Sequence, residues 1–203
     1  MGPGLDDDAV VEQLLVLRAQ MGARDAYAGL VHRYDARLLF YLRRLLGSPA
    51  AAEDVRQDVW LTVVRKLNTL DNPAAFRTWL YRVARHRGIS WLRKRRREVP
   101  LEEAGPLEEV VAKNETDDAS GFSADEATAV HVALDTLSRS HRETLGLRFL
   151  GGLTYEEMAG VLDCRVGTVR SRIHYAKAAL RVALAGLVGG AANTSKRTDI
   201  DDR

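Results

Sequence analysis

Apolar residues recur at the spacing of an α-helix along most of this chain. Between residues 9 and 46 the period is 3.6 residues, as in Val10, Leu14 and Leu17, and Gly22 interrupts it once. No segment alternates apolar and polar residues over the length of a β-strand. The pattern therefore predicts an all-α protein.

Short segments rich in turn-forming residues separate the later helical patterns. Gly47-Ser48-Pro49 ends the first pattern, and Asn, Asp and Pro mark a loop at 68–73. Helices are therefore expected from about residue 50 to 67, from 74 to 97, and twice more between 125 and 150.

Residues 150–181 predict two helices joined by a short turn. Thr154 is expected to cap the first helix, because Glu157 stands three residues later, as in a capping box. The second helix carries an apolar stripe on one side and cations on the other. Such a pair is typical of proteins that enter the DNA major groove, although an ordinary helical hairpin with a solvated basic face has the same pattern. The stripe is formed by Val169, Ile173, Ala176 and Leu180.

Charge is distributed unevenly, although the net charge is only +2. Residues 76–97 contain nine Lys and Arg side chains and no acid, with Tyr81, His86 and Trp91 among them. Cations follow phosphates and flat rings stack on unpaired bases, so this segment favours nucleic acid over a solvated face, where both signs usually mix. Residues 98–126 then contain ten acids and one Lys, together with Pro, Gly and Ser, which predicts a flexible acidic linker.

The expected fold class is therefore all-α, with two small helical domains joined by a flexible acidic linker. The first domain is expected at 9–97 and the linker at 98–124. The second, a four-helix domain ending in the helix–turn–helix, is expected at 125–187, and a disordered tail at 188–203.

Composition argues against several functional classes. A single cysteine, Cys164, allows no internal disulfide and fits a cytoplasmic protein. No apolar run is long enough to span a membrane. The sequence shows no phosphate-binding loop or nucleophile elbow, and the five histidines lack the spacing of metal ligands. The chain is therefore expected to bind rather than catalyse, with no catalytic residue, metal or cofactor.

Three segments resemble those of one bacterial family. Residues 52–60 resemble its core-polymerase-binding helix, residues 76–85 its helix for the promoter −10 element, and residues 155–159 with 166–173 its −35-reading motif. In this order, around an acidic linker, they make the chain similar to RNA polymerase sigma factors of the small, two-domain extracytoplasmic-function group. The resemblance covers residues 23–97 and 124–182.

The resemblance implies a protein that binds core RNA polymerase, reads promoter DNA and helps to melt it. Its implied partners are the β′ coiled coil and β subunit of the polymerase, promoter DNA and an anti-sigma factor. The implied residues for β′ are Glu53, Asp54, Gln57 and Asp58. Those for the −10 element and melting are Asn68, Asp71, Asn72, Phe76, Trp79, Tyr81, Arg82, Arg85 and His86, and those for the −35 element are Arg148, Arg165, Thr168, Arg170, Ser171, Arg172 and His174.

The residues alone leave alternatives open. The acidic patch at 53–58 also suits a solvated helix start, where the helix dipole favours acids. A standalone helix–turn–helix regulator would explain the second domain, and an interaction protein would explain the opposite charges. The basic segment 76–97 favours the sigma factor, because a standalone regulator does not need it. His86, Ser90 and Tyr175 replace the Asn, Asp and Arg frequent in the family, so no promoter consensus is transferred.

Overall fold

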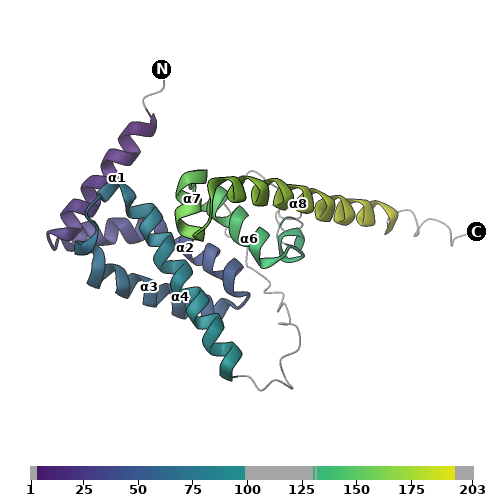
Figure 1. Ribbon diagram of the computed structural model, residues 1–203, viewed down its shortest axis with the longest axis horizontal. Coiled ribbons are helices and arrows are strands. Elements are labelled where there is room, and N and C mark those ends of the chain that lie inside the picture. The colour runs from purple at the N-terminus through teal and green to yellow at the C-terminus, as the bar shows by residue number, and fades with distance from the viewer. Residues whose placement is uncertain (1–3, 99–129, 131, 195–203) are drawn as a thin grey trace, which may run out of the picture.

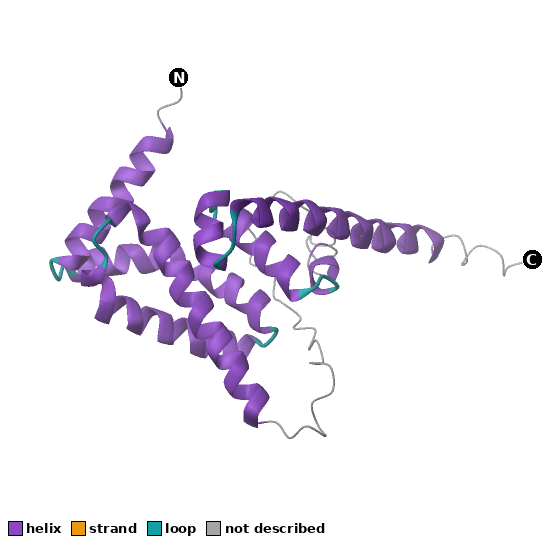
Figure 2. Cartoon of the chain, in the orientation of Figure 1, coloured by secondary structure: helices purple, strands orange, loops and turns teal. Residues whose placement is uncertain are grey.

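The computed structural model describes residues 4–98, 130 and 132–194. Figures 1 and 2 show two groups of helices, and the described residues contain no strand. The first group comprises α1 to α4 and the second comprises α6 to α8. The expected all-α fold is confirmed. Within these described ranges, each helix is too short or too polar to cross a bilayer.

Local sequence explains the breaks between helices of the first group. Gly47 ends α2 with φ of 66°, a left-handed conformation that glycine adopts without strain. The side chain of Ser48 accepts a hydrogen bond from the Ala51 N–H, and Pro49 begins α3, where its missing N–H costs nothing. The helices are α1 (Gly4–Gln20), α2 (Arg24–Leu46), α3 (Pro49–Lys66) and α4 (Phe76–Glu98).

Two short 3₁₀ turns connect α3 to α4. They are η1 (Leu67–Thr69) and η2 (Pro73–Ala75). Between them, the side-chain oxygen of Asn72 accepts a hydrogen bond from the Ala74 N–H at 3.0 Å. This cap lets helical geometry resume directly after the predicted loop.

The apolar repeat that predicted α1 lies mostly on the exposed side of the helix. The side chains of Val16 and Ala19 are buried, whereas Val10, Leu14 and Leu17 are 62%, 54% and 48% exposed. The periodicity thus specified a helix, but the face that packs inward is a different one. The largest fully buried side chains of the first group are Leu30, Leu38, Tyr41, Leu42, Leu45, Leu67, Phe76, Leu80 and Tyr81.

The second group contains the predicted helix–turn–helix. Its capping box is confirmed: the Thr154 hydroxyl accepts from the Glu157 N–H at 3.2 Å, and the Glu157 carboxylate accepts from the Thr154 N–H at 2.7 Å. Asp163, with φ of 53°, ends the first helix of the motif. The elements are a helical turn at 132–135, α6 (Arg139–Leu145), the π-helical η3 (Gly146–Leu150), α7 (Tyr155–Leu162) and α8 (Val166–Thr194).

Helix α8 is longer than expected. The structure differs from the predicted disordered tail at 188–194, where the backbone remains helical. Gly189 and Gly190 each lower helix stability by about 1 kcal/mol relative to Ala, but extending an existing helix avoids the cost of nucleation. The remaining parts of the predicted linker and tail, 99–124 and 195–203, lie outside the described residues.

The two groups pack against each other in what we call the closed arrangement (Figure 1). Helix α4 lies against α7, and α2 lies against α6 and η3. Tyr41 and Tyr81 are fully buried near this contact, edge to face, with ring centroids 5.4 Å apart. The missing side chain of Gly151 allows the approach, because a Cβ there would lie 3.2 Å from the Tyr81 ring.

Candidate nucleic-acid interfaces

The N-terminal part of α8 presents the predicted recognition face. Val169, Ile173 and Ala176 are buried while α8 packs against α6 and α7, so the rotation of the helix about its axis is fixed. The opposite face meets solvent, and its polar side chains can reach a major groove. Arg165, Arg170, Ser171 and His174 are exposed, and Thr168 and Arg172 are half-buried.

Cations extend this face onto η3. Arg148 is exposed; it donates a hydrogen bond to the Leu153 carbonyl at 2.8 Å, and its guanidinium lies 5.2 Å from the centroid of the Tyr155 ring. The Lys177 ammonium lies 5.3 Å from the centroid of the exposed Phe149 ring. Exposed cations of the second group therefore lie on both η3 and α8.

The loop between α3 and α4 exposes polar side chains while its backbone is held from α1. Gln20 donates from Nε2 to the carbonyl oxygens of Leu67 and Leu70, at 2.9 Å and 2.8 Å. Sequence reasoning missed Gln20, because it lies 47 residues before Leu67 and belongs to no motif. The predicted −10 residues of this loop, Asn68, Asp71 and Asn72, are all exposed.

Helix α4 carries other predicted −10 residues, and its first half faces the second group. Arg85 donates from Nε to Oε1 of Glu143 at 2.8 Å, and the Tyr41 hydroxyl donates to the same oxygen at 3.2 Å. Glu143 is only 7% exposed, so its carboxylate is buried between the groups. The sequence did not indicate these pairs, which span 58 and 102 positions.

Two further arginines of α4 bind oxygen atoms of α7. Arg82 donates from Nε and Nη2 to the Gly160 carbonyl, at 3.2 Å and 3.0 Å. Arg77 donates to both carboxylate oxygens of Glu157, at 3.0 Å and 3.1 Å. Burial alone raises the pKa of Glu157, but hydrogen bonds from Thr154 and Arg77 outweigh it and lower that pKa below its usual value. In the closed arrangement these arginines therefore have partners within the chain.

The predicted −10 rings differ in accessibility. Phe76 and Tyr81 are fully buried; Phe76 packs edge-on against Tyr34 with centroids 5.6 Å apart, and burial raises the pKa of Tyr81 to about 12. Trp79 is half-buried and His86 is exposed. Phe76 and Tyr81 are thus core residues in the closed arrangement, whereas the Trp79 and His86 rings reach the surface.

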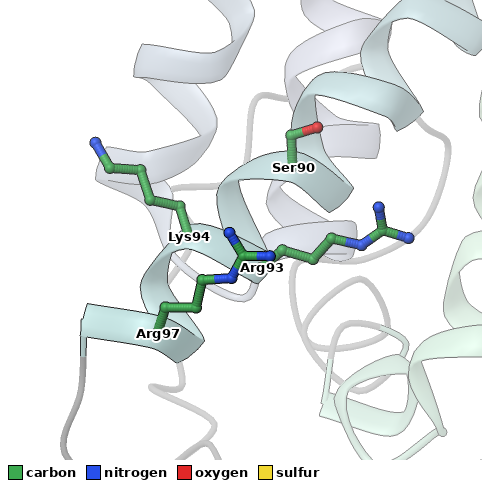
Figure 3. A pocket seen from close by; sticks show the side chains of 4 residues that line it. All are labelled: Ser90, Arg93, Lys94 and Arg97. Carbon is green, nitrogen blue, oxygen red and sulfur yellow. The ribbon is translucent and has the colours of Figure 1, made fainter.

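The second half of α4 carries a cationic hollow of about 340 Å³ (Figure 3). One hydroxyl and three long cationic side chains line it, from positions on successive turns of the helix. Clustered cations of this kind suit phosphate groups. The hollow is lined by Ser90, Arg93, Lys94 and Arg97, the last three from the basic run at 93–97.

Helix α3 carries the predicted polymerase-docking residues on its outer side. Glu53 is held by Arg43 at 3.2 Å and by Arg56 at 2.8 Å. The other acidic and polar members are exposed, and two apolar residues that the sequence analysis did not single out continue the face. This exposed surface, here called the α3 face, comprises Asp54, Gln57, Asp58, Leu61 and Val64.

Comparison with known proteins agrees with this geometry. The family model described as Sigma-70 region 2 matches residues 30–98, and the one described as Sigma-70, region 4 matches residues 127–180. The chain is 35% identical over 184 residues to the RNA polymerase sigma-H factor of Pseudomonas aeruginosa, covering 87% of this chain and 95% of that protein. It is 33% identical over 180 residues to the ECF RNA polymerase sigma-E factor of Escherichia coli K12, with 85% and 94% covered.

Two solved structures are also similar. The sigma factor RpoE in complex with the anti-sigma factor NepR, from Bartonella quintana, matches with a TM-score of 0.67 and 26% identity, covering 78% of this chain and 96% of that one. CnrH in complex with the cytosolic domain of CnrY matches with a TM-score of 0.63 and 25% identity, covering 87% and 98%. The resemblance seen in the sequence is confirmed, and the chain belongs to the sigma-70 family, in its extracytoplasmic-function group.

Proposed function

We propose that this sigma factor reads the −35 element with α8 and holds the melted −10 region with the loop at 67–75 and α4. Membership of the family accounts for promoter-directed transcription. What we propose here is which residues contact each promoter element. The observation that carries it is the exposed cationic face of α8, which three buried apolar residues hold in a fixed rotation.

On α8, Arg170, Ser171 and His174 contact base edges, because they are exposed on the same side of the helix. An arginine can bind a guanine edge through two hydrogen bonds, worth about 1–3 kcal/mol of discrimination. Arg148 and Arg165 lie at the margin and bind phosphates, which position the protein without reading sequence. Thr168 and Arg172 complete the proposed −35 set.

The −10 region is held by two elements of the first group. The loop offers exposed amide and carboxylate groups to the edges of unpaired bases, and Trp79 and His86 offer rings for stacking. Arg82 and Arg85 reach DNA only after the second group releases them, and Tyr81 becomes accessible at the same step. Phe76 supports the site from the core. The loop residues are Asn68, Asp71 and Asn72.

The α3 face is the proposed docking site for the polymerase β′ coiled coil. It combines acidic groups, which steer a basic partner, with exposed Leu61 and Val64, whose burial supplies affinity. The Glu53 carboxylate already binds Arg43 and Arg56. Glu53 therefore acts by holding these two arginines in place rather than by direct contact with β′. The acidic linker is proposed to run past the β subunit through the cleft that otherwise holds nucleic acid.

We also propose that an anti-sigma factor binds this chain. The support for this is the similarity to RpoE, which is in complex with the anti-sigma factor NepR. We further propose that the chain is no enzyme and acts in the cytoplasm, where polymerase and DNA meet. The relatives it matches are sigma factors, which serve the polymerase and do not themselves catalyse.

To test this function, the purified chain is added to core RNA polymerase that lacks any sigma factor, with host genomic DNA as the template. The 5′ ends of the transcripts are then mapped. We expect new, defined start sites that share −35 and −10 sequences upstream. A standalone regulator binds duplex DNA without polymerase and starts no transcript. A chain that binds DNA and yields no start site therefore contradicts the proposal.

A further inference from the structure

Gln20, the last residue of α1, ties that helix to the loop between α3 and α4. Its Nε2 donates to the carbonyl oxygens of Leu67 and Leu70, at 2.9 Å and 2.8 Å. Carbonyl oxygens only accept hydrogen bonds, so the NH₂ of the amide must face them, and both of its hydrogens are used. No carboxylate or aliphatic side chain could replace this contact.

Helix α1 also supports the far end of the loop. The Tyr34 hydroxyl donates a hydrogen bond to Glu12 of α1, and the Tyr34 ring packs edge-on against Phe76, the first residue of α4. Burial, and next the bond to Glu12, raise the pKa of Tyr34 well above its usual value, so the hydroxyl stays a donor. Helix α1 thus contacts η1 and η2 directly and, through Tyr34 of α2, supports the start of α4.

The backbone between these two anchors is well defined. Leu67 is fully buried, and its carbonyl also accepts from the Leu70 N–H at 3.0 Å. The side chain of Asn72 caps the Ala74 N–H at 3.0 Å. Gln20 thus acts at the point from which the exposed loop side chains project. These are Asn68, Asp71 and Asn72.

We propose that Gln20 is a positioning residue for capture of the melted −10 strand. By holding the carbonyls of Leu67 and Leu70, it fixes the loop in one conformation before DNA arrives. A loop that is already ordered loses less conformational entropy on binding and presents its polar groups to bases in one geometry. The inference rests on the proposed function of the loop.

Three variants separate this role from general stability. Gln20→Leu keeps the approximate size and removes both donors. Gln20→Glu places carboxylate oxygens against two carbonyl oxygens, which repel them. Gln13→Leu is the matched control, because Gln13 is also half-buried and lies seven residues earlier on the same face of α1.

The experiment uses each variant as the full chain bound to core polymerase. The probes are single-stranded oligonucleotides that span the −10 element of a promoter found by start-site mapping, with each of the four bases at each position. Fluorescence anisotropy gives the ratio of affinities between the promoter base and the other bases. Core affinity and thermal unfolding are measured in parallel.

We expect Gln20→Leu to lower this ratio about tenfold, the size expected for the loss of two hydrogen bonds. Gln20→Glu should lower it further, and Gln13→Leu should leave it unchanged. A smaller folded fraction lowers the binding of every oligonucleotide by the same factor and leaves the ratio intact. The ratio therefore reports positioning of the loop rather than stability.

The outcomes distinguish this inference from the function on which it rests. A wild-type ratio in Gln20→Leu, in a polymerase that opens promoters with the wild-type chain, overturns the role of Gln20 alone. An equal loss in Gln13→Leu overturns it too, because α1 as a whole would then be responsible. A wild-type chain that opens no promoter overturns the proposed function, and the role of Gln20 falls with it.

Discussion

The two surfaces that we propose face DNA differ in what covers them. The recognition face of α8 meets solvent, with Arg170 and His174 exposed. The first half of α4 lies against the second group, where Arg82 and Arg85 bind a carbonyl and a carboxylate. In the closed arrangement, the surface proposed to read intact duplex is therefore available. The surface proposed to hold unpaired strands is only partly available, because Arg82 and Arg85 are occupied while the loop residues are exposed. Under the proposed function, Arg82 and Arg85 join strand capture only when the two groups separate.

The substitution Glu143→Lys should have the largest effect, because it should release the first half of α4 from the second group. A lysine at this buried position faces Arg85 with like charge. Breaking a buried ion pair costs about 3–5 kcal/mol, so we expect closure to weaken by more than about a hundredfold. Small-angle X-ray scattering should then show a larger radius of gyration.

The matched control for this variant adds Arg85→Glu to Glu143→Lys. The double variant restores opposite charges across the contact and should return the radius of gyration toward the wild-type value. If the single variant keeps the wild-type radius, Glu143 does not hold the groups together.

Arg170→Ala tests the exposed face of α8 and should have an intermediate effect. We expect the loss of about 1–3 kcal/mol of binding to lower transcription from a promoter with an intact −35 element by roughly fivefold to 150-fold. The same promoter with its −35 element replaced should show no further loss. Arg181→Ala is the control, since Arg181 is also exposed on α8. Equal losses on both promoters would remove Arg170 from −35 reading.

Alkaline pH should give the smallest effect, through the buried tyrosines. Burial raises the pKa of Tyr81 to about 12 and raises the pKa of Tyr41 above its usual value. The closed arrangement therefore holds these phenolic protons more tightly than the open one. Closure is at full strength below pH 10 and weakens as pH rises above 10, by about tenfold per pH unit for one such group.

Scattering between pH 8 and pH 11 measures this dependence, with circular dichroism to verify that the helices persist. Replacing Tyr41 and Tyr81 by Phe should remove it, because neither ring then carries a proton to lose. Expansion with the same midpoint in the double Phe variant would assign the effect to other groups.

Local signals in the sequence predicted the parts of the fold that depend on neighbouring residues. The capping box of Thr154 and Glu157 needs residues three apart, and the buried stripe of α8 needs one helical period. Both were therefore visible before the structure. The exposure of Leu14 on α1 was not, because a period predicts a helix but does not say which neighbour covers it.

The contacts that hold the loop and that cover the first half of α4 were not predictable from local signals. Gln20 meets Leu67 across 47 residues, and Arg85 meets Glu143 across 58. Such pairs depend on how whole helices pack, and no spacing rule encodes them. Reading α4 as a DNA surface was reasonable from its charge, but the sequence did not show that its arginines have other partners in the closed arrangement.

The arginines at the interface of α4 and the second group have a consequence for ions in solution. When the groups separate as proposed, Arg77 and Arg85 leave carboxylates and Arg82 leaves a main-chain carbonyl, and Arg82 and Arg85 turn to phosphates. Each carboxylate set free attracts a cation from the buffer, which offsets a cation released from the DNA. We therefore expect promoter opening by this chain to be less sensitive to salt than the number of its arginines implies.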